Sequence, residues 1–92
     1  MIINAEKEIP YFKDKVRAVI NRYQTSKRPA EIVVMRVSGW PLEKICSFYA
    51  YKDLKPIYSA LRYALYKTQF DDVVMFAIDV TKHLNKLFLE GS

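Results

Sequence analysis

The chain has 92 residues with a formal net charge of +5 at pH 7, and 51% of them are hydrophobic. That apolar fraction excludes a disordered chain and is ample for one packed domain over residues 1–92. No apolar run reaches the roughly 18 residues of a membrane-spanning helix, and no signal sequence follows Met1, so we expect a soluble, cytoplasmic protein.

The residue types that carry most enzyme and metal chemistry are scarce. A single cysteine, Cys46, excludes an internal disulfide, and together with the single histidine, His83, it is too little for a zinc site. The chain has no glycine-rich phosphate loop, and helix capping accounts for its one acidic pair, Asp71-Asp72. We therefore expect a protein that is not an enzyme, with no catalytic residue, no metal and no cofactor.

The positive charge is concentrated in the middle of the chain. Residues 13–67 contain twelve Lys or Arg and four acidic residues, a net charge of +8, whereas residues 1–12 carry −1 and residues 68–92 carry −2. Binding to a phosphate backbone needs such a concentration of positive charge. Charged surfaces of this kind are also typical of thermophilic proteins, so the pattern does not by itself identify nucleic acid as the partner.

The first two predicted helices follow a short N-terminal tail. Over residues 10–24, apolar residues recur on one helical face, at Phe12, Val16, Val19, Ile20 and Tyr23. A second helix begins at Pro29 and is mostly apolar, so it should be buried. Ser38-Gly39 ends this helix, because glycine suits the left-handed residue that follows many helices.

Two further helices are predicted over residues 41–50 and 53–69. Pro41 suits a first helical residue, whose N–H has no intrahelical partner. Asp53 suits the N-cap of the second helix, and Pro56 lies in its first turn. The residues predicted to face inward from this helix are Ile57, Leu61, Ala64 and Leu65.

A fifth helix is predicted over residues 72–89. Its apolar residues extend almost around the helix, which is more than a domain of this size buries, so we expect a homodimer or protein contact there. The alternative is that this helix runs through the middle of the bundle. The residues expected at the interface are Met75, Phe76, Val80, His83, Leu87 and Phe88.

Residues 29–67 resemble the helix-turn-helix of small archaeal transcription regulators, winged-helix proteins included. Cys46 occupies the position where the first helix of that motif usually has Ala, and Ile57 and Leu61 match the apolar anchors of the recognition helix. Ala50 opens the turn in place of the usual Gly, which argues against a left-handed residue there. The resemblance implies an all-α, five-helix domain with a central trihelical helix-turn-helix over residues 29–69. No wing is predicted, because nothing after Lys67 alternates with the period of a strand.

The resemblance also implies that the helix over residues 53–69 reads DNA. Arg62 is suited to contacting guanine in the major groove, and Ser59 to contacting a base or a phosphate. Lysines on and around this helix would contact the phosphate backbone and so fix the orientation of the protein on the DNA. The full set of expected DNA contacts is Lys27, Arg28, Lys44, Lys52, Lys55, Ser59, Arg62, Tyr63, Tyr66 and Lys67.

Two functions from different classes fit these observations. The first is a transcription regulator or architectural protein that binds duplex DNA as a dimer. The second is a small accessory subunit of a nucleic-acid machine, such as a DNA polymerase, a primase or a CRISPR effector, which acts through protein contacts. A plain helical bundle with the same caps and no nucleic-acid partner also fits the pattern.

Overall fold

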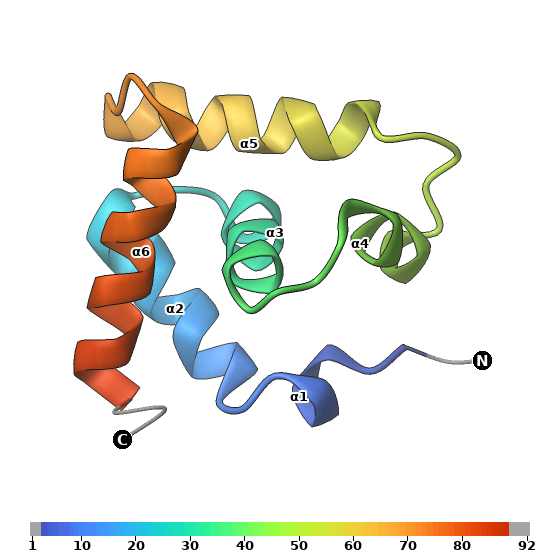
Figure 1. Ribbon diagram of the computed structural model, residues 1–92, viewed down its shortest axis with the longest axis horizontal. Helices are drawn as coiled ribbons and strands as arrows, with labels where there is room; N and C mark the ends of the chain where they lie inside the picture. The colour runs from blue at the N-terminus through green and yellow to red at the C-terminus, as the bar shows by residue number, and fades with distance from the viewer. Residues whose placement is uncertain (1–2, 89–92) are drawn as a thin grey trace.

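The computed structural model describes residues 3–88, which form helices joined by short loops and include no strand. The helices of this described part, shown in Figure 1, are α1 (Ala5–Glu8), α2 (Phe12–Tyr23), α3 (Lys27–Val37), α4 (Leu42–Tyr49), α5 (Lys55–Thr68) and α6 (Val73–Phe88). The predicted all-helical class is confirmed. Within residues 3–88 there are six helices, and the prediction of five was wrong.

The additional helix, α1, lies in the segment predicted to be a tail. Its single turn begins where the Oδ1 atom of Asn4 accepts a hydrogen bond from the Lys7 N–H at 3.2 Å. Ala5 and Ile9, at either end of the turn, are only 3% and 2% exposed. One turn is too short to show helical periodicity in a sequence, and an isolated turn is unstable in water. We infer that burial of these two apolar side chains holds α1 in place.

The boundaries of α3 and α4 agree with the predicted start and stop residues, apart from two small differences. Gly39 has a φ of 99°, and the N–H groups of Gly39 and Trp40 donate to the carbonyls of Arg36 and Met35, both at 3.1 Å. This is the Schellman arrangement that ends a helix with a left-handed glycine. The structure begins α3 at Lys27, two residues before Pro29, and makes Pro41 the N-cap of α4 instead of its first helical residue.

The start of α5 also differs from the prediction by one residue. Leu54 is the N-cap, and Asp53 precedes it. The carboxylate of Asp53 nevertheless accepts a hydrogen bond from the Lys55 N–H at 2.9 Å, so it satisfies one of the unpaired donors at the helix end. Asp72 acts in the same way at α6, accepting from the Val74 N–H at 2.7 Å.

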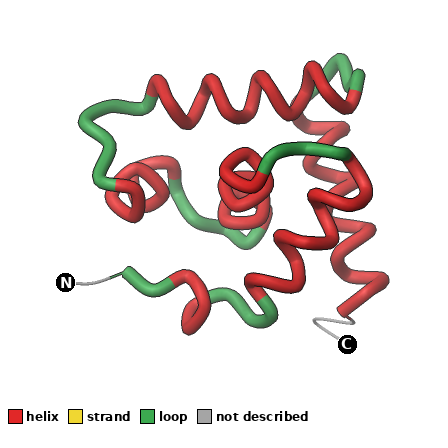
Figure 2. Tube along the Cα trace, turned by 180° about the vertical axis from the view of Figure 1, so that it is seen from behind, coloured by secondary structure: helices red, strands yellow, loops and turns green. Residues whose placement is uncertain are grey.

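The centre of the fold is α3, which contacts α2, α4, α5 and α6. In Figure 1 it is seen nearly end-on, with α5 crossing above it, α4 on one side, and α2 and α6 on the other. Figure 2 shows the same arrangement from behind. Its residues 32–35 are at most 3% exposed, because a helix that is apolar on most sides is stable only when surrounded. The predicted burial of this helix is confirmed.

Candidate nucleic-acid interface

The helix α5 lies at the edge of the fold, with one side packed and the other open to solvent. Ile57 and Ala64 are completely buried on the inner side, and Leu61 and Leu65 beside them are partly buried. These are the four residues that the spacing placed inward, so that prediction is confirmed. The opposite side exposes polar and aromatic side chains, namely Lys55, Tyr58, Ser59, Arg62, Tyr63, Tyr66 and Lys67.

Four of these exposed residues, Lys55, Ser59, Arg62 and Tyr66, form the α5 stripe. They recur at i, i+4, i+7 and i+11, so they line up along the outermost face of the helix. The side chain of Tyr66 is 80% exposed, and the flanking Tyr58 and Tyr63 are 50% and 40% exposed. Tyrosine is enriched at interfaces, so three exposed tyrosines on one helix favour a contact surface here.

The charged residues within α5 are all positive. The helix contains three cations, Lys55, Arg62 and Lys67, and no acidic residue. Among residues 3–88, no ion pair involves any of the three. The loop before the helix adds Lys52 and Asp53, so residues 51–69 carry four cations and one acid, a net charge of +3. These cations therefore remain available to an anionic ligand.

The turn that precedes α5 is held by backbone hydrogen bonds. Ala50 is left-handed, with a φ of 58° and a ψ of 36°, although an alanine at this position argued against that conformation. The Tyr51 N–H donates to the Cys46 carbonyl at 3.0 Å, and the Ala50 N–H donates to the Ser47 carbonyl at 3.2 Å. The Cys46 thiol also lies 3.2 Å from the Tyr51 carbonyl oxygen. We infer that these contacts offset the strain of a left-handed alanine.

Arg28 makes contacts within the protein, beside the loop that leads into α5. Its Nη1 atom donates to the Tyr51 hydroxyl at 2.6 Å, and its guanidinium lies 4.8 Å from the centre of the Tyr49 ring. The hydrogen bond to Tyr51 raises the pKa of Arg28 above its usual value. The Tyr49 hydroxyl in turn donates to Glu31 at 2.8 Å, and burial, followed by this bond, raises the pKa of Tyr49.

The other three lysines predicted to contact DNA phosphates from outside α5 have different surroundings. Lys44 forms an ion pair with Glu8 and lies 4.4 Å from the centre of the Trp40 ring, so it ties α4 to α1. Lys27 lines a cleft with residues of α2, on the side of α3 that faces that helix. Lys52 is exposed in the loop that leads directly into α5. The structure therefore places Lys52 beside the start of α5, whereas Arg28 and Lys44 have partners within the protein and Lys27 lies beside α2.

One feature beside the α5 stripe had no signal in the sequence. An open hollow of about 730 Å³ lies at the C-terminal end of α5, and Arg62, Tyr66 and Lys67 line it together with Gln69, Phe70 and the acidic Asp71. The chain turns at this end of the helix, where Gln69 is left-handed with a φ of 60°. Two cations and an aromatic ring lie together here, as at sites for phosphate and base groups, with one carboxylate beside them.

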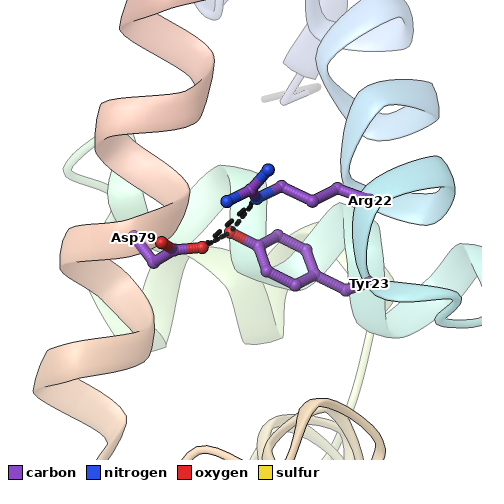
Figure 3. A network of polar contacts seen from close by, with 3 residues as sticks. All are labelled: Arg22, Tyr23 and Asp79. Carbon is purple, nitrogen blue, oxygen red and sulfur yellow. Dashed lines mark hydrogen bonds and ion pairs between the residues drawn. The ribbon is translucent and has the colours of Figure 1, made fainter.

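A second polar cluster, drawn in Figure 3, joins the end of α2 to α6. The Tyr23 hydroxyl donates to the Asp79 carboxylate, and the Arg22 Nε atom lies 3.3 Å from both partners. Burial and the bond to Asp79 raise the pKa of Tyr23 to about 12, while the bond from Tyr23 lowers the pKa of Asp79. Burial, with Arg22 nearby, also lowers the pKa of His83. Because this cluster is occupied by its own contacts, we interpret it as structural.

The predicted interface residues of α6 do not share one surface. Phe76 and Val80 are 2% and 0% exposed and belong to the core, so the structure corrects their assignment to a dimer or partner contact. Met75 and Leu87 are 56% and 52% exposed. Phe88 and His83 are partly buried, and the Phe88 ring stacks on Tyr11 at 5.6 Å between ring centres. One face of α6 packs on α2 and α3, and the opposite face is exposed to solvent. The helix therefore does not run through the middle of the bundle.

Within residues 3–88 no cluster of three or more His, Cys, Asp or Glu side chains is placed to hold a metal ion. No helix in the described part of the chain is long and apolar enough to cross a membrane. Comparisons with family models, with curated proteins and with solved structures found no match.

Proposed function

We propose that this chain is a DNA-binding protein without enzymatic activity, a transcription regulator or an architectural protein. In this proposal α3, α4 and α5 act as a helix-turn-helix, and α5 is the recognition helix. The observation that carries the proposal is the α5 stripe, which is exposed along its length and flanked by cations that have no ion-pair partner within residues 3–88.

The dimensions of α5 suit the major groove of duplex DNA. From Lys55 to Tyr66 the stripe advances eleven residues, about 16 Å at the usual rise of an α-helix. The major groove is about 12 Å wide and admits one helix. Arg62 lies in the second half of the stripe, where a guanidinium can bind both acceptors of guanine, and Ser59 lies one turn before it. Lys52, Lys55 and Lys67 then lie near the two ends of α5, where they would contact phosphates.

The first test is the salt dependence of binding to duplex DNA, measured by fluorescence anisotropy. If the protein neutralises about six phosphates, the logarithm of the binding constant falls with the logarithm of salt concentration at a slope near −5. Duplex and single-stranded DNA are compared under the same conditions, and the duplex is expected to bind more tightly. A binding constant that does not change with salt concentration would exclude this mode of binding.

The second test removes two cations of the α5 stripe and compares them with a matched pair elsewhere. We expect Lys55→Ala combined with Arg62→Ala to weaken binding by at least tenfold and to reduce the salt slope by about two. The control is Lys13→Ala combined with Arg17→Ala on α2, which removes the same charge from residues paired with Glu6 and Asp14. Equal losses from the two double variants would mean that net charge, and not α5, determines binding.

A second candidate function is an accessory subunit of a nucleic-acid machine. The observation that favours it is the apolar surface on α6, where Val74, Met75 and Ile78 are 59%, 56% and 44% exposed. In that case the purified protein binds DNA weakly by itself, and Met75→Asp abolishes its assembly with the partner. The anisotropy experiment separates the two functions, because only a recognition helix gives tight binding that depends on Arg62.

A further inference from the structure

An apolar groove lies between α6 and α3, and no part of residues 3–88 covers it. Its volume is about 670 Å³, and Val33 and Val37 of α3 line it together with Val74, Ala77 and Ile78 of α6. Val74 and Ile78 leave 59% and 44% of their surface exposed to water. Apolar surface this continuous on a small domain marks a contact with another molecule.

The α6 wall of the groove has the length and the period of a surface that binds a helix. Its lining residues include pairs one turn apart, at positions 73–74, 77–78 and 81–82, which lie on one face of α6. From Val73 to Lys82 this face advances nine residues, about 14 Å at the usual rise of an α-helix. Pockets for small molecules bury most of their ligand, whereas the walls of this groove are about half open to water. An amphipathic helix laid along the groove is therefore the better fit.

The charged residues that line the groove are all positive. They are Arg36 of α3 and Lys82 of α6, and no ion pair within residues 3–88 involves either of them. The acidic residues of α3 and α6 are Glu31 and Asp79, and each accepts a hydrogen bond from a tyrosine hydroxyl outside the groove. The groove is therefore complementary to a ligand that combines apolar side chains with negative charge.

We propose that the groove binds an acidic amphipathic helix of a partner protein. Its apolar side chains lie between α3 and α6, and its carboxylates pair with Arg36 and Lys82. Arg36 donates from Nη1 to the Trp40 carbonyl at 3.1 Å, and its other guanidinium donors are free to bind a carboxylate. The docking does not depend on the proposed DNA function, since the one residue of α5 that lines the groove, Leu61, faces inward, away from the α5 stripe.

The charges of the groove favour this partner over two others. A second copy docked through the same face would bring the Arg36 and Lys82 side chains of both copies together, and like charges repel. Duplex DNA would pair with the two cations, but its phosphate backbone would leave the apolar walls uncovered. An acidic amphipathic helix satisfies both the cations and the apolar walls.

The test is the fluorescence anisotropy of a labelled synthetic peptide titrated with the full chain. The probe is an amphipathic peptide of about four turns, with leucine at i, i+3 and i+7 on one face and glutamate at the flanking positions. We expect a dissociation constant in the micromolar range. A comparison peptide keeps the leucines and has lysine in place of every glutamate, and it should bind more weakly by about tenfold or more. Absence of binding of the acidic peptide up to about 1 mM, or equal affinity of the two peptides, overturns the proposal.

A substitution at the centre of the groove tests the place of binding. Ile78→Asp should raise the dissociation constant of the acidic peptide by about 30-fold or more, as for a central interface residue. The matched control is Leu87→Asp, which places the same charge at a comparably exposed apolar residue of α6 outside the groove and should change the constant by less than about twofold. Equal effects of the two aspartates overturn the proposal. Circular dichroism of both variants establishes that the helices remain folded.

Removal of the two cations tests the charge complementarity separately from the apolar contact. Arg36→Ala combined with Lys82→Ala should weaken binding of the acidic peptide by about tenfold, because two ion pairs are lost. The control is Lys55→Ala combined with Arg62→Ala, which removes the same charge outside the groove and should leave the peptide affinity within about twofold. Equal losses from the two double variants overturn the proposal. The α5 variant is also the one expected to lose DNA binding, so the two proposals can fail separately.

Two further measurements identify the other occupants. The chain has a mass of 10.8 kDa, and light scattering is expected to give this mass at micromolar concentrations. A mass of twice that, 21.6 kDa, which Ile78→Asp returns to 10.8 kDa, would mean that a second copy covers the groove. Displacement of the acidic peptide by duplex DNA, in the variant that lacks the two α5 cations, would mean that nucleic acid occupies it. Either result overturns the proposal.

Discussion

Ala50, in the turn between α4 and α5, provides a direct test of how that turn is held. Its φ of 58° is left-handed, which costs an L-residue with a Cβ atom roughly 1–2 kcal/mol. Glycine avoids this cost, but it loses more conformational freedom on folding, worth about 0.4–1 kcal/mol. The side chain of Ala50 is exposed, so removing its methyl group sacrifices little packing. We therefore expect Ala50→Gly to stabilise the protein by about 0.5–1 kcal/mol.

The measurement is thermal unfolding followed by far-ultraviolet circular dichroism. In a domain of this size a gain of 1 kcal/mol raises Tm by about 4–8 °C, so Ala50→Gly should raise it by about 2–8 °C. Ala18→Gly, inside α2, is the matched control and should lower stability by about 1 kcal/mol, because glycine is a poor helix former. Gly39→Ala should also destabilise the protein. A Cβ atom at Gly39 meets nothing within 4 Å, so its φ of 99° is the only cause. The reasoning is refuted if Ala50→Gly lowers Tm as Ala18→Gly does.

Two further predictions concern the polar clusters. Because the pKa of Asp79 is lower in the folded protein than its unfolded value of about 3.9, its contribution to stability is complete above that pH and is lost as the pH falls through the folded pKa. In the original protein the free energy of unfolding should therefore fall below about pH 4, and Asp79→Asn and Tyr23→Phe should each make that fall less steep. Urea denaturation at several pH values measures it, and an unchanged slope in both variants would contradict the assigned cause. Arg28→Ala should change DNA affinity by less than about twofold, because its guanidinium already donates to a tyrosine hydroxyl, and a tenfold loss by anisotropy would place Arg28 at the DNA after all.

The helices were largely predictable because their signals are local. Proline in a first turn, glycine after a last turn, and an aspartate whose oxygen reaches a nearby N–H each act within about four residues. Ile57 and Ala64 are buried, and Arg62 is exposed, as the period of α5 predicts. The same reasoning missed α1, because one turn has no period. It also misjudged Ala50, whose conformation depends on the bonds at the end of α4.

The role of each charged or apolar side chain outside α5 was not predictable in this way. Arg28 and Lys44 are residue types that often bind phosphate. In the structure Arg28 donates to Tyr51, 23 residues away along the chain, and Lys44 donates to Glu8, 36 residues away. Phe76 is a residue type common at interfaces, yet its ring packs edge-on against Tyr23 at 5.2 Å between ring centres. Such pairings depend on how helices cross, and several crossings are compatible with one pattern of apolar residues.

The sequence by itself therefore determined the helical class, the approximate ends of five helices and the side of α5 that faces solvent, since each of these follows from interactions within one or two turns. Only the tertiary structure decided which cations remain unpaired, which side of α6 is buried and where the groove beside α3 lies. Those properties arise from contacts between residues far apart in the chain, and their free energies depend on the relative positions of whole helices.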